Sequence, residues 1–141
     1  MESWLRVFVY GTLKPRCRYH QRCCGDFLTE AVPALVKGRL YNFPQLGYPA
    51  MTRGEDWIKG FLLTFRQSAA VCADVLRRLD QLEDYSEMRS PEENDYQRCQ
   101  RPVFYLDREP WITAWTYEMT IEKIRSYGGV YLPSGEWSAT S

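Results

Sequence analysis

The sequence predicts an α+β fold, or a β-barrel with appended helices. Many segments have the apolar or alternating pattern of β-strands, whereas only one long segment has the periodicity of a helix. The links between these segments also lack the regular strand–helix alternation of a doubly wound parallel sheet. Because 141 residues fit one domain, we expect residues 1–141 to fold as a single domain.

Six segments have the pattern of strands: Leu5–Tyr10, Ala31–Tyr41, Pro49–Thr52, Ile58–Phe65, Tyr96–Leu106 and Trp111–Tyr117. The first is mostly apolar, which is typical of a central strand, and Gly11 ends it in a turn. In the second, Gly38 marks the expected position of a β-bulge. The last alternates, with Trp111, Thr113, Trp115 and Tyr117 on one face.

Ser68 is an N-cap residue for the one long predicted helix, which covers 69–84. The next segment, Ser86–Asp95, holds four acidic residues and a proline, and we expect a solvated loop there. Ile121–Tyr127 is predicted to form a short second helix. We expect the glycine- and proline-bearing tail, Gly128–Ser141, to be irregular.

The composition indicates binding to neither nucleic acid nor membranes. Eighteen basic residues balance eighteen acidic residues, whereas a nucleic-acid-binding protein usually has a basic excess. No stretch approaches the roughly 18 apolar residues of a membrane span. Met1–Leu13 also lacks the apolar run and the small-residue cleavage site of a signal peptide. We therefore expect a soluble, cytoplasmic protein.

Residues 14–30 are polar and rich in cysteine, and we expect a loop with a short helix there. Cys17, Cys23, Cys24 and the only histidine, His20, cluster in this loop. Thiolates and one imidazole can bind zinc, but adjacent cysteines suit a single metal poorly and no second ligand pair follows at the usual spacing. We therefore predict reduced thiols without a metal, and a surface position for His20.

Glu83 is the most informative candidate for chemistry. It lies one turn after Leu79, near the centre of the apolar face of the predicted helix. A carboxylate on that face costs desolvation energy unless it is paired or neutral. Three interpretations are open: a general acid/base with a raised pKa, a buried structural partner of Arg98, or a solvent-exposed group beyond the end of the helix.

A second candidate is the turn that follows the first strand. The strand breaks at Gly11, immediately after Tyr10, and such a break exposes successive backbone N–H groups. These groups can bind a carboxylate or a developing oxyanion. Because many strands end in Gly-Thr, the pattern alone favours an ordinary structural turn.

Seven blocks are spread over most of the chain, between residues 7 and 117: VFVYGTLKP (7–15), GRLYNF (38–43), GYPAM (47–51), KGFLLTF (59–65), LDQLEDY (79–85), YQR (96–98) and AWTY (114–117). In this order they resemble the γ-glutamylcyclotransferase-like family, which includes the γ-glutamylamine cyclotransferases and the AIG2-like proteins. The fifth block contains the family's Leu-Asp-x-x-Glu pattern. The sequence departs from this family at Arg16, where relatives often have glycine.

The resemblance implies a compact mixed β-barrel with flanking helices. It also implies that Glu83 is the catalytic acid/base and that Tyr10, Gly11, Thr12 and Leu13 bind substrate. The implied activity is the cyclisation of a γ-glutamyl compound. In this reaction the α-amine of the substrate attacks its γ-carbonyl, and 5-oxoproline and an amine are released.

Such a reaction requires no protein nucleophile, metal or cofactor, and we expect none. The expected partner is a small-molecule γ-glutamyl substrate, and the expected assembly is a monomer or a small homo-oligomer. The alternative function is a non-catalytic module that binds a small metabolite or a partner in the same pocket. An unpaired Glu83 argues against this alternative, since a binder gains little from an unpaired buried carboxylate, whereas a Glu83–Arg98 pair would support it.

Overall fold

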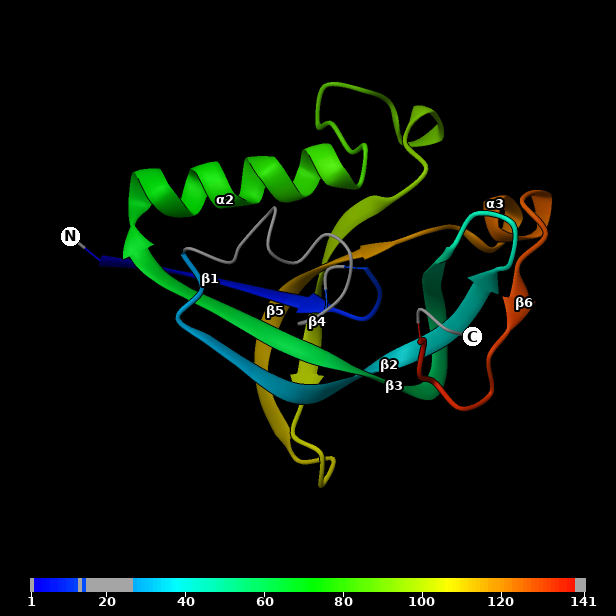
Figure 1. The fold of residues 1–141 in the computed structure, drawn as a ribbon, viewed down its shortest axis with the longest axis horizontal. Coiled ribbons are helices and arrows are strands. Elements are labelled where there is room, and N and C mark those ends of the chain that lie inside the picture. The colour runs from blue at the N-terminus through cyan, green and yellow to red at the C-terminus, as the bar shows by residue number, and fades with distance from the viewer. Residues whose placement is uncertain (1, 13, 15–26, 139–141) are drawn as a thin grey trace.

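Six strands form one mixed sheet that closes on itself in the computed structural model, which describes residues 2–12, 14 and 27–138. The strands are β1 (Glu2–Val9), β2 (Glu30–Phe43), β3 (Tyr48–Ser68), β4 (Gln97–Phe104), β5 (Pro110–Glu118) and β6 (Val130–Tyr131). Their order is β3-β1-β5-β4-β2-β6, and β3 also pairs with β2, so that five strands form a ring (Figure 1).

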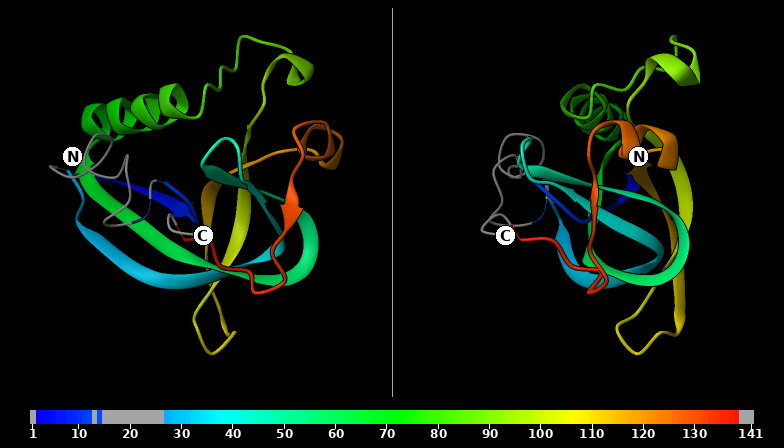
Figure 2. Two further views of the ribbon diagram at one scale, coloured as in Figure 1. Left: turned by 45° about the vertical axis from the view of Figure 1, so that its right-hand side comes forward. Right: turned by 90° about the vertical axis from the view of Figure 1, so that its right-hand side faces the viewer.

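The described helices flank this ring: α2 (Ala69–Leu82), the short 3-10 helix η1 (Pro91–Glu93) and α3 (Ile121–Ser126). Helix α2 lies along one side of the sheet, and the turn between β4 and β5 projects on the opposite side of the molecule (Figures 1 and 2). These elements confirm the predicted α+β class with flanking helices. The ring is uneven, because β1 pairs with β5 only at Val7–Trp115 and β2 pairs with β4 only at Leu35–Phe104.

Strand β3 differs from the prediction, which divided it into the two strands 49–52 and 58–65. It is one continuous strand that pairs with β2 along its length, with a register shift between Gly38 and Arg39. Because Gly38 pairs with Asp56 and Arg39 with Thr52, residues 53–55 form the extra part of a bulge. These polar residues led to the prediction of a break between two strands. In the structure they instead form a bulge opposite Gly38, where the sequence predicted one.

Helix α2 begins and ends with recognisable caps. The Ser68 side chain accepts a hydrogen bond from the N–H of Val71 over 3.2 Å, which confirms the predicted N-cap. The helix ends at Leu82, two residues earlier than predicted. Asp84 has a φ of 50°, and the N–H of Tyr85 donates to the carbonyl of Asp80, so that the end is a left-handed C-cap motif.

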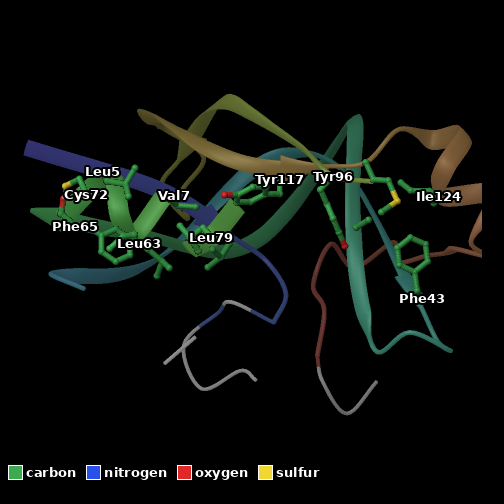
Figure 3. Close-up of a cluster of buried hydrophobic side chains, with 14 residues drawn as sticks. Leu5, Val7, Phe43, Leu63, Phe65, Cys72, Leu79, Tyr96, Tyr117 and Ile124 are labelled. Carbon is green, nitrogen blue, oxygen red and sulfur yellow. Dashed lines mark hydrogen bonds between the residues drawn. The ribbon is translucent and has the colours of Figure 1, made fainter. Parts of the chain in front are cut away.

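Alternate residues of β1 belong to two separate hydrophobic clusters. Leu5, Val7 and Val9 pack in the cluster beneath α2 (Figure 3). Phe8 and Tyr10 pack in a second cluster. Because successive residues of a strand point to opposite faces, β1 is buried on both sides, as its continuous apolar run predicted. This central position holds the C-terminal end of β1, and the turn that follows it, firmly in place.

The C-terminal tail also departs from the prediction of an irregular segment. Val130 and Tyr131 form β6, whose residues pair with Asn42 and Tyr41 of β2. A two-residue strand is too short to produce an alternating pattern, which explains why the sequence did not indicate it. Within the described residues, no helix has the length and hydrophobicity needed to cross a membrane.

Candidate active site

A cavity of about 380 Å³ lies where the C-terminal ends of β1 and α2 meet. Its lining includes Tyr10, Gly11, Thr12 and Glu83. The structure therefore brings the turn after β1 next to Glu83, which lies more than 70 residues later in the sequence. Leu13, the remaining predicted site residue, lies outside the described residues. The volume is within the range of about 300–1,000 Å³ typical of small-molecule sites.

Gly11 and Thr12 of the turn after β1 line this cavity. The N–H of Lys14 donates to the carbonyl of Gly11 over 3.0 Å, which closes the turn. Within residues 2–12, 14 and 27–138, no hydrogen-bond acceptor is found for the N–H of Gly11 or Thr12. A Cβ added at Gly11 would lie 2.8 Å from the Pro49 ring, so the chain approaches β3 more closely here than a side chain allows.

The cap of α2 positions Glu83. Its N–H donates to the carbonyl of Leu79 over 3.0 Å, so Glu83 follows Leu79 by one helical turn even though it is the C-cap residue. The helix ends one residue before Glu83, but Glu83 keeps the helical position one turn after Leu79. The predicted position of Glu83 on the apolar face is therefore confirmed. In the described part of the chain, its carboxylate has no hydrogen-bond or ion-pair partner. Burial raises the pKa of Glu83 from its ordinary value of 4.5 to about 7.

Three tyrosine hydroxyls surround the carboxylate without neutralising it. Tyr10 Oη donates to the carbonyl of Tyr117 over 2.5 Å, Tyr96 Oη donates to the carbonyl of Pro49 over 2.6 Å, and Tyr117 Oη donates to Asp80 Oδ1 over 2.6 Å. Each hydroxyl proton is thus committed elsewhere. Burial, followed by the charge of Glu83, raises the pKa of Tyr10 well above its ordinary value, and this phenol stays protonated. The surroundings therefore offer the ionised form of Glu83 little compensation for lost water.

Arg98 pairs with other carboxylates, so the suggested Glu83–Arg98 pair is not formed. Its Nη1 lies 2.6 Å from Asp80 Oδ2, and its Nη2 pairs with Glu87. Its guanidinium group also stacks on the ring of Trp115, 4.8 Å from the centroid. The interpretation of Glu83 as the structural partner of Arg98 is therefore wrong, which removes the observation that would have supported a purely binding module.

The sequence alone did not identify several residues of the cavity wall. Tyr96 and Tyr117 are buried residues that line it, together with Pro49 and Tyr48 at the start of β3. A signal for Tyr117 was present, because the alternation of β5 placed it on a face with large aromatic residues. Its role as a wall of this cavity depends on the pairing of Arg98 with Tyr117 in the β4–β5 register, which is a long-range property. The cysteine cluster and His20 lie outside the described residues.

Comparison with known proteins supports the sequence resemblance. The sequence model of one protein family, described as γ-glutamyl cyclotransferase, AIG2-like, matches residues 7–139. No curated protein matches this sequence at a significant level.

Several solved structures share the fold. An AIG2-like protein from Mus musculus superimposes with a TM-score of 0.66 at 18% identity, over 96% of this chain and 88% of the mouse chain. A protein from Arabidopsis thaliana gives a TM-score of 0.58 at 25% identity, over 96% of this chain and 70% of its own. YkqA from Bacillus subtilis gives 0.59 at 23% identity over 97% of this chain, which spans only 40% of the length of YkqA. At such identities the likeness establishes the fold.

Proposed function

Because this chain belongs to the AIG2-like γ-glutamyl cyclotransferase family, we propose that it cyclises a γ-glutamyl compound and releases 5-oxoproline together with an amine or amino acid. The observation that carries the proposal is the position of Glu83. It is a carboxylate without a partner among the described residues, has a pKa near 7, and shares a cavity with the turn at Gly11 and Thr12.

The proposed reaction is an intramolecular acyl transfer. A bond forms between the α-nitrogen of the substrate and its γ-carbon, while the bond between the γ-carbon and the leaving nitrogen breaks. The α-ammonium nitrogen loses two protons as it becomes the lactam N–H, and the leaving nitrogen gains two as it departs as an ammonium ion. The nucleophile and the electrophile both belong to the substrate, so the chemistry requires no metal, cofactor or covalent enzyme intermediate.

Glu83 has the properties that both proton transfers require. A general acid/base works best when its pKa is close to the operating pH, since both protonation states are then accessible. The pKa of about 7 places Glu83 in that range. In the proposed mechanism its carboxylate accepts one proton from the α-ammonium group and donates it to the leaving nitrogen, and it then transfers the second proton between the same two nitrogens.

The turn after β1 is proposed to hold the γ-glutamyl group. The N–H groups of Gly11 and Thr12 are available to bind the substrate carboxylate or the oxyanion that develops on the γ-carbonyl oxygen. The cavity walls formed by Tyr10, Tyr96 and Tyr117 restrict the γ-glutamyl group of the substrate to a folded conformation. Holding the amine next to the carbonyl lowers the entropic part of the activation barrier, because binding energy offsets this cost before the reaction begins.

A coupled assay for 5-oxoproline tests this proposal. We expect the purified protein to release 5-oxoproline from at least one member of a panel of γ-glutamyl amines, γ-glutamyl amino acids and γ-glutamyl peptides. A matched panel of α-glutamyl compounds is the control. It should give no product because the leaving nitrogen is then attached to the α-carbonyl, and attack of the α-amine on that carbon would close a three-membered ring. If no γ-glutamyl compound reacts but 5-oxoproline binds in the cavity, the non-catalytic alternative is supported instead.

A further inference from the structure

A second cavity, of about 510 Å³, lies on the other side of the strands that build the candidate active site. Successive residues of a strand point to opposite faces. Tyr96 and Tyr117 line the first cavity, whereas their neighbours Gln97 and Glu118 line the second. Among the described residues, the two cavities share no lining residue. The second cavity is therefore a separate site that the proposed reaction does not use.

Positive charge exceeds negative charge around this second cavity. Its charged lining residues are four arginines and two glutamates: Arg39, Arg53, Arg101, Arg125, Glu118 and Glu122. Arg101 and Glu118 neutralise each other, because Arg101 Nε lies 2.5 Å from Glu118 Oε2 and Nη2 donates to Oε1 over 3.0 Å. Three arginines then face one glutamate, which leaves an excess of two positive charges. The whole chain has a formal net charge of +0, so this excess is local.

No described carboxylate neutralises the three remaining arginines, although the guanidinium group of Arg39 lies over the ring of Tyr131, 5.4 Å from its centroid. Across the part of the chain that the structure describes, Arg39, Arg53 and Arg125 have no carboxylate partner. They come from three different elements, β2, β3 and α3, and are brought to one rim by the fold. Arg53 belongs to the residues that the β3 bulge inserts, and such bulges commonly redirect side chains toward a site.

The walls below this rim are largely apolar. Met119 is buried, and Ile121 and Tyr41 are half-buried. The amide of Gln97 and the hydroxyl of Thr52 add neutral polar groups beside them. A bare inorganic ion would leave these apolar walls unused. A ligand that matches the whole cavity combines an anionic group with an apolar body.

We propose that this cavity binds a small organic anion. Its carboxylate or phosphate group contacts Arg53 and Arg125, with Arg39 beside them, and its apolar body packs on Met119 and Ile121. The planar guanidinium group matches the geometry of both anions and forms paired, charge-assisted hydrogen bonds with them. The cavity has the volume of a small-molecule site.

Calorimetric titration with three probes tests the proposal: phenyl phosphate, phenylacetate and the neutral benzyl alcohol. We expect at least one of the two anions to bind with a stoichiometry of one and more tightly than the alcohol. Its affinity should fall as salt is added. The tighter of the two identifies the preferred anionic group. Backbone amide shifts in NMR spectra should change at Gln97, Cys99 and Met119 and not at Gly11 or Thr12.

Two variants and one control assign the binding to the rim. Arg53→Gln and Arg125→Gln should each weaken binding of the anion about tenfold, the loss expected for one charge-assisted contact. Arg77→Gln is the matched control, since this exposed arginine of α2 pairs with Asp74 and lies outside the lining of this cavity. Equal affinity in all variants, shifts confined to the first cavity, or no binding of either anion at millimolar concentration would overturn the proposal.

Discussion

Glu83 differs from the acidic residues of α2, and from Asp84 that follows it, in having no described partner for its carboxylate. Asp74 pairs with Arg77 and Arg78 within α2, Asp80 pairs with Arg98, and Asp84 pairs with Arg89. These arginines hold their carboxylates in structural contacts. Glu83 instead lines the cavity, where burial raises its pKa to about 7. Helix α2 and its C-terminal cap thus contain several carboxylates in structural ion pairs and one, that of Glu83, which is unpaired among the described residues and lines the cavity.

Replacing Glu83 with glutamine should remove the acid/base and little else. The variant keeps the size of the side chain but cannot exchange a proton, so we expect kcat for 5-oxoproline release to fall by about 10²–10⁴-fold. Binding of 5-oxoproline should change much less, because the backbone turn, and not Glu83, is proposed to hold the γ-glutamyl group. The coupled assay and a binding titration measure the two effects separately. A Glu83→Gln variant that turns over normally would refute the catalytic role.

The raised pKa of Glu83 also predicts two pH dependences. The base form accumulates as the pH rises, so kcat/KM should increase through an inflection near 7, and the residual activity of Glu83→Gln should lack this inflection. The folded protein binds this proton more tightly than the unfolded chain, so stability declines as the pH rises from about 4.5 to about 7. Thermal melts should therefore show Glu83→Gln gaining stability relative to the wild type across that window.

Gly11 offers a test of the substrate turn. In Gly11→Ala the new methyl group would lie 2.8 Å from Pro49, so the turn must move away from β3. We expect this overpacking to lower stability by about 1–3 kcal/mol and to raise KM more than it lowers kcat. Steady-state kinetics at a temperature where circular dichroism shows a folded protein provides the measurement. Unchanged KM in a folded variant would show that the turn does not hold the substrate.

At the scale of elements, α2 has a stabilising cap at its N-terminal end and the proposed acid/base just beyond its C-terminal end. Its N-cap, Ser68, lies at the far end of the helix from Glu83. Ser68→Ala should lower the free energy of unfolding by about 1 kcal/mol, the usual cost of a lost N-cap. Its kcat at a temperature well below the melting transition should match the wild type. A loss of activity in the fully folded variant would contradict this separation.

At the scale of the whole molecule, the two hydrophobic clusters are joined by shared strands. Leu79 is buried in the cluster beneath α2, and Leu62 is buried in the other cluster. Because β1 and β3 supply residues to both clusters, we expect one cooperative unfolding transition. Leu79→Ala and Leu62→Ala should each lower stability by about 2–5 kcal/mol and should shift the same transition. Chemical denaturation followed by tryptophan fluorescence and by circular dichroism tests this, and separate transitions would contradict it.

Local patterns in the sequence determined most of the elements. The Ser68 cap and the apolar period of α2 depend on neighbouring residues, and the structure confirms both of them. The alternation of β5 is also local, but the strand is buried on both faces toward its C-terminal end, where Ala114, Thr116 and Glu118 are buried, as Tyr117 is. The one-turn spacing from Leu79 to Glu83 is likewise local, which is why the candidate acid/base could be singled out before its surroundings were known. The breaking of β1 at Gly11 indicated the turn for the same reason.

Tertiary structure alone decided the features that depend on distant residues. The partner of Arg98 is Asp80 rather than Glu83, because the register of β4 against β5 and the packing of α2 set which carboxylate it meets. The polar residues 53–55 remain within one strand because β2 pairs on both sides of them. The pKa of Glu83 follows from the desolvation of its carboxylate, and residues far away in the sequence create that environment. Short-range periodicity therefore placed Glu83 on its element, whereas long-range packing raised the pKa of its carboxyl group.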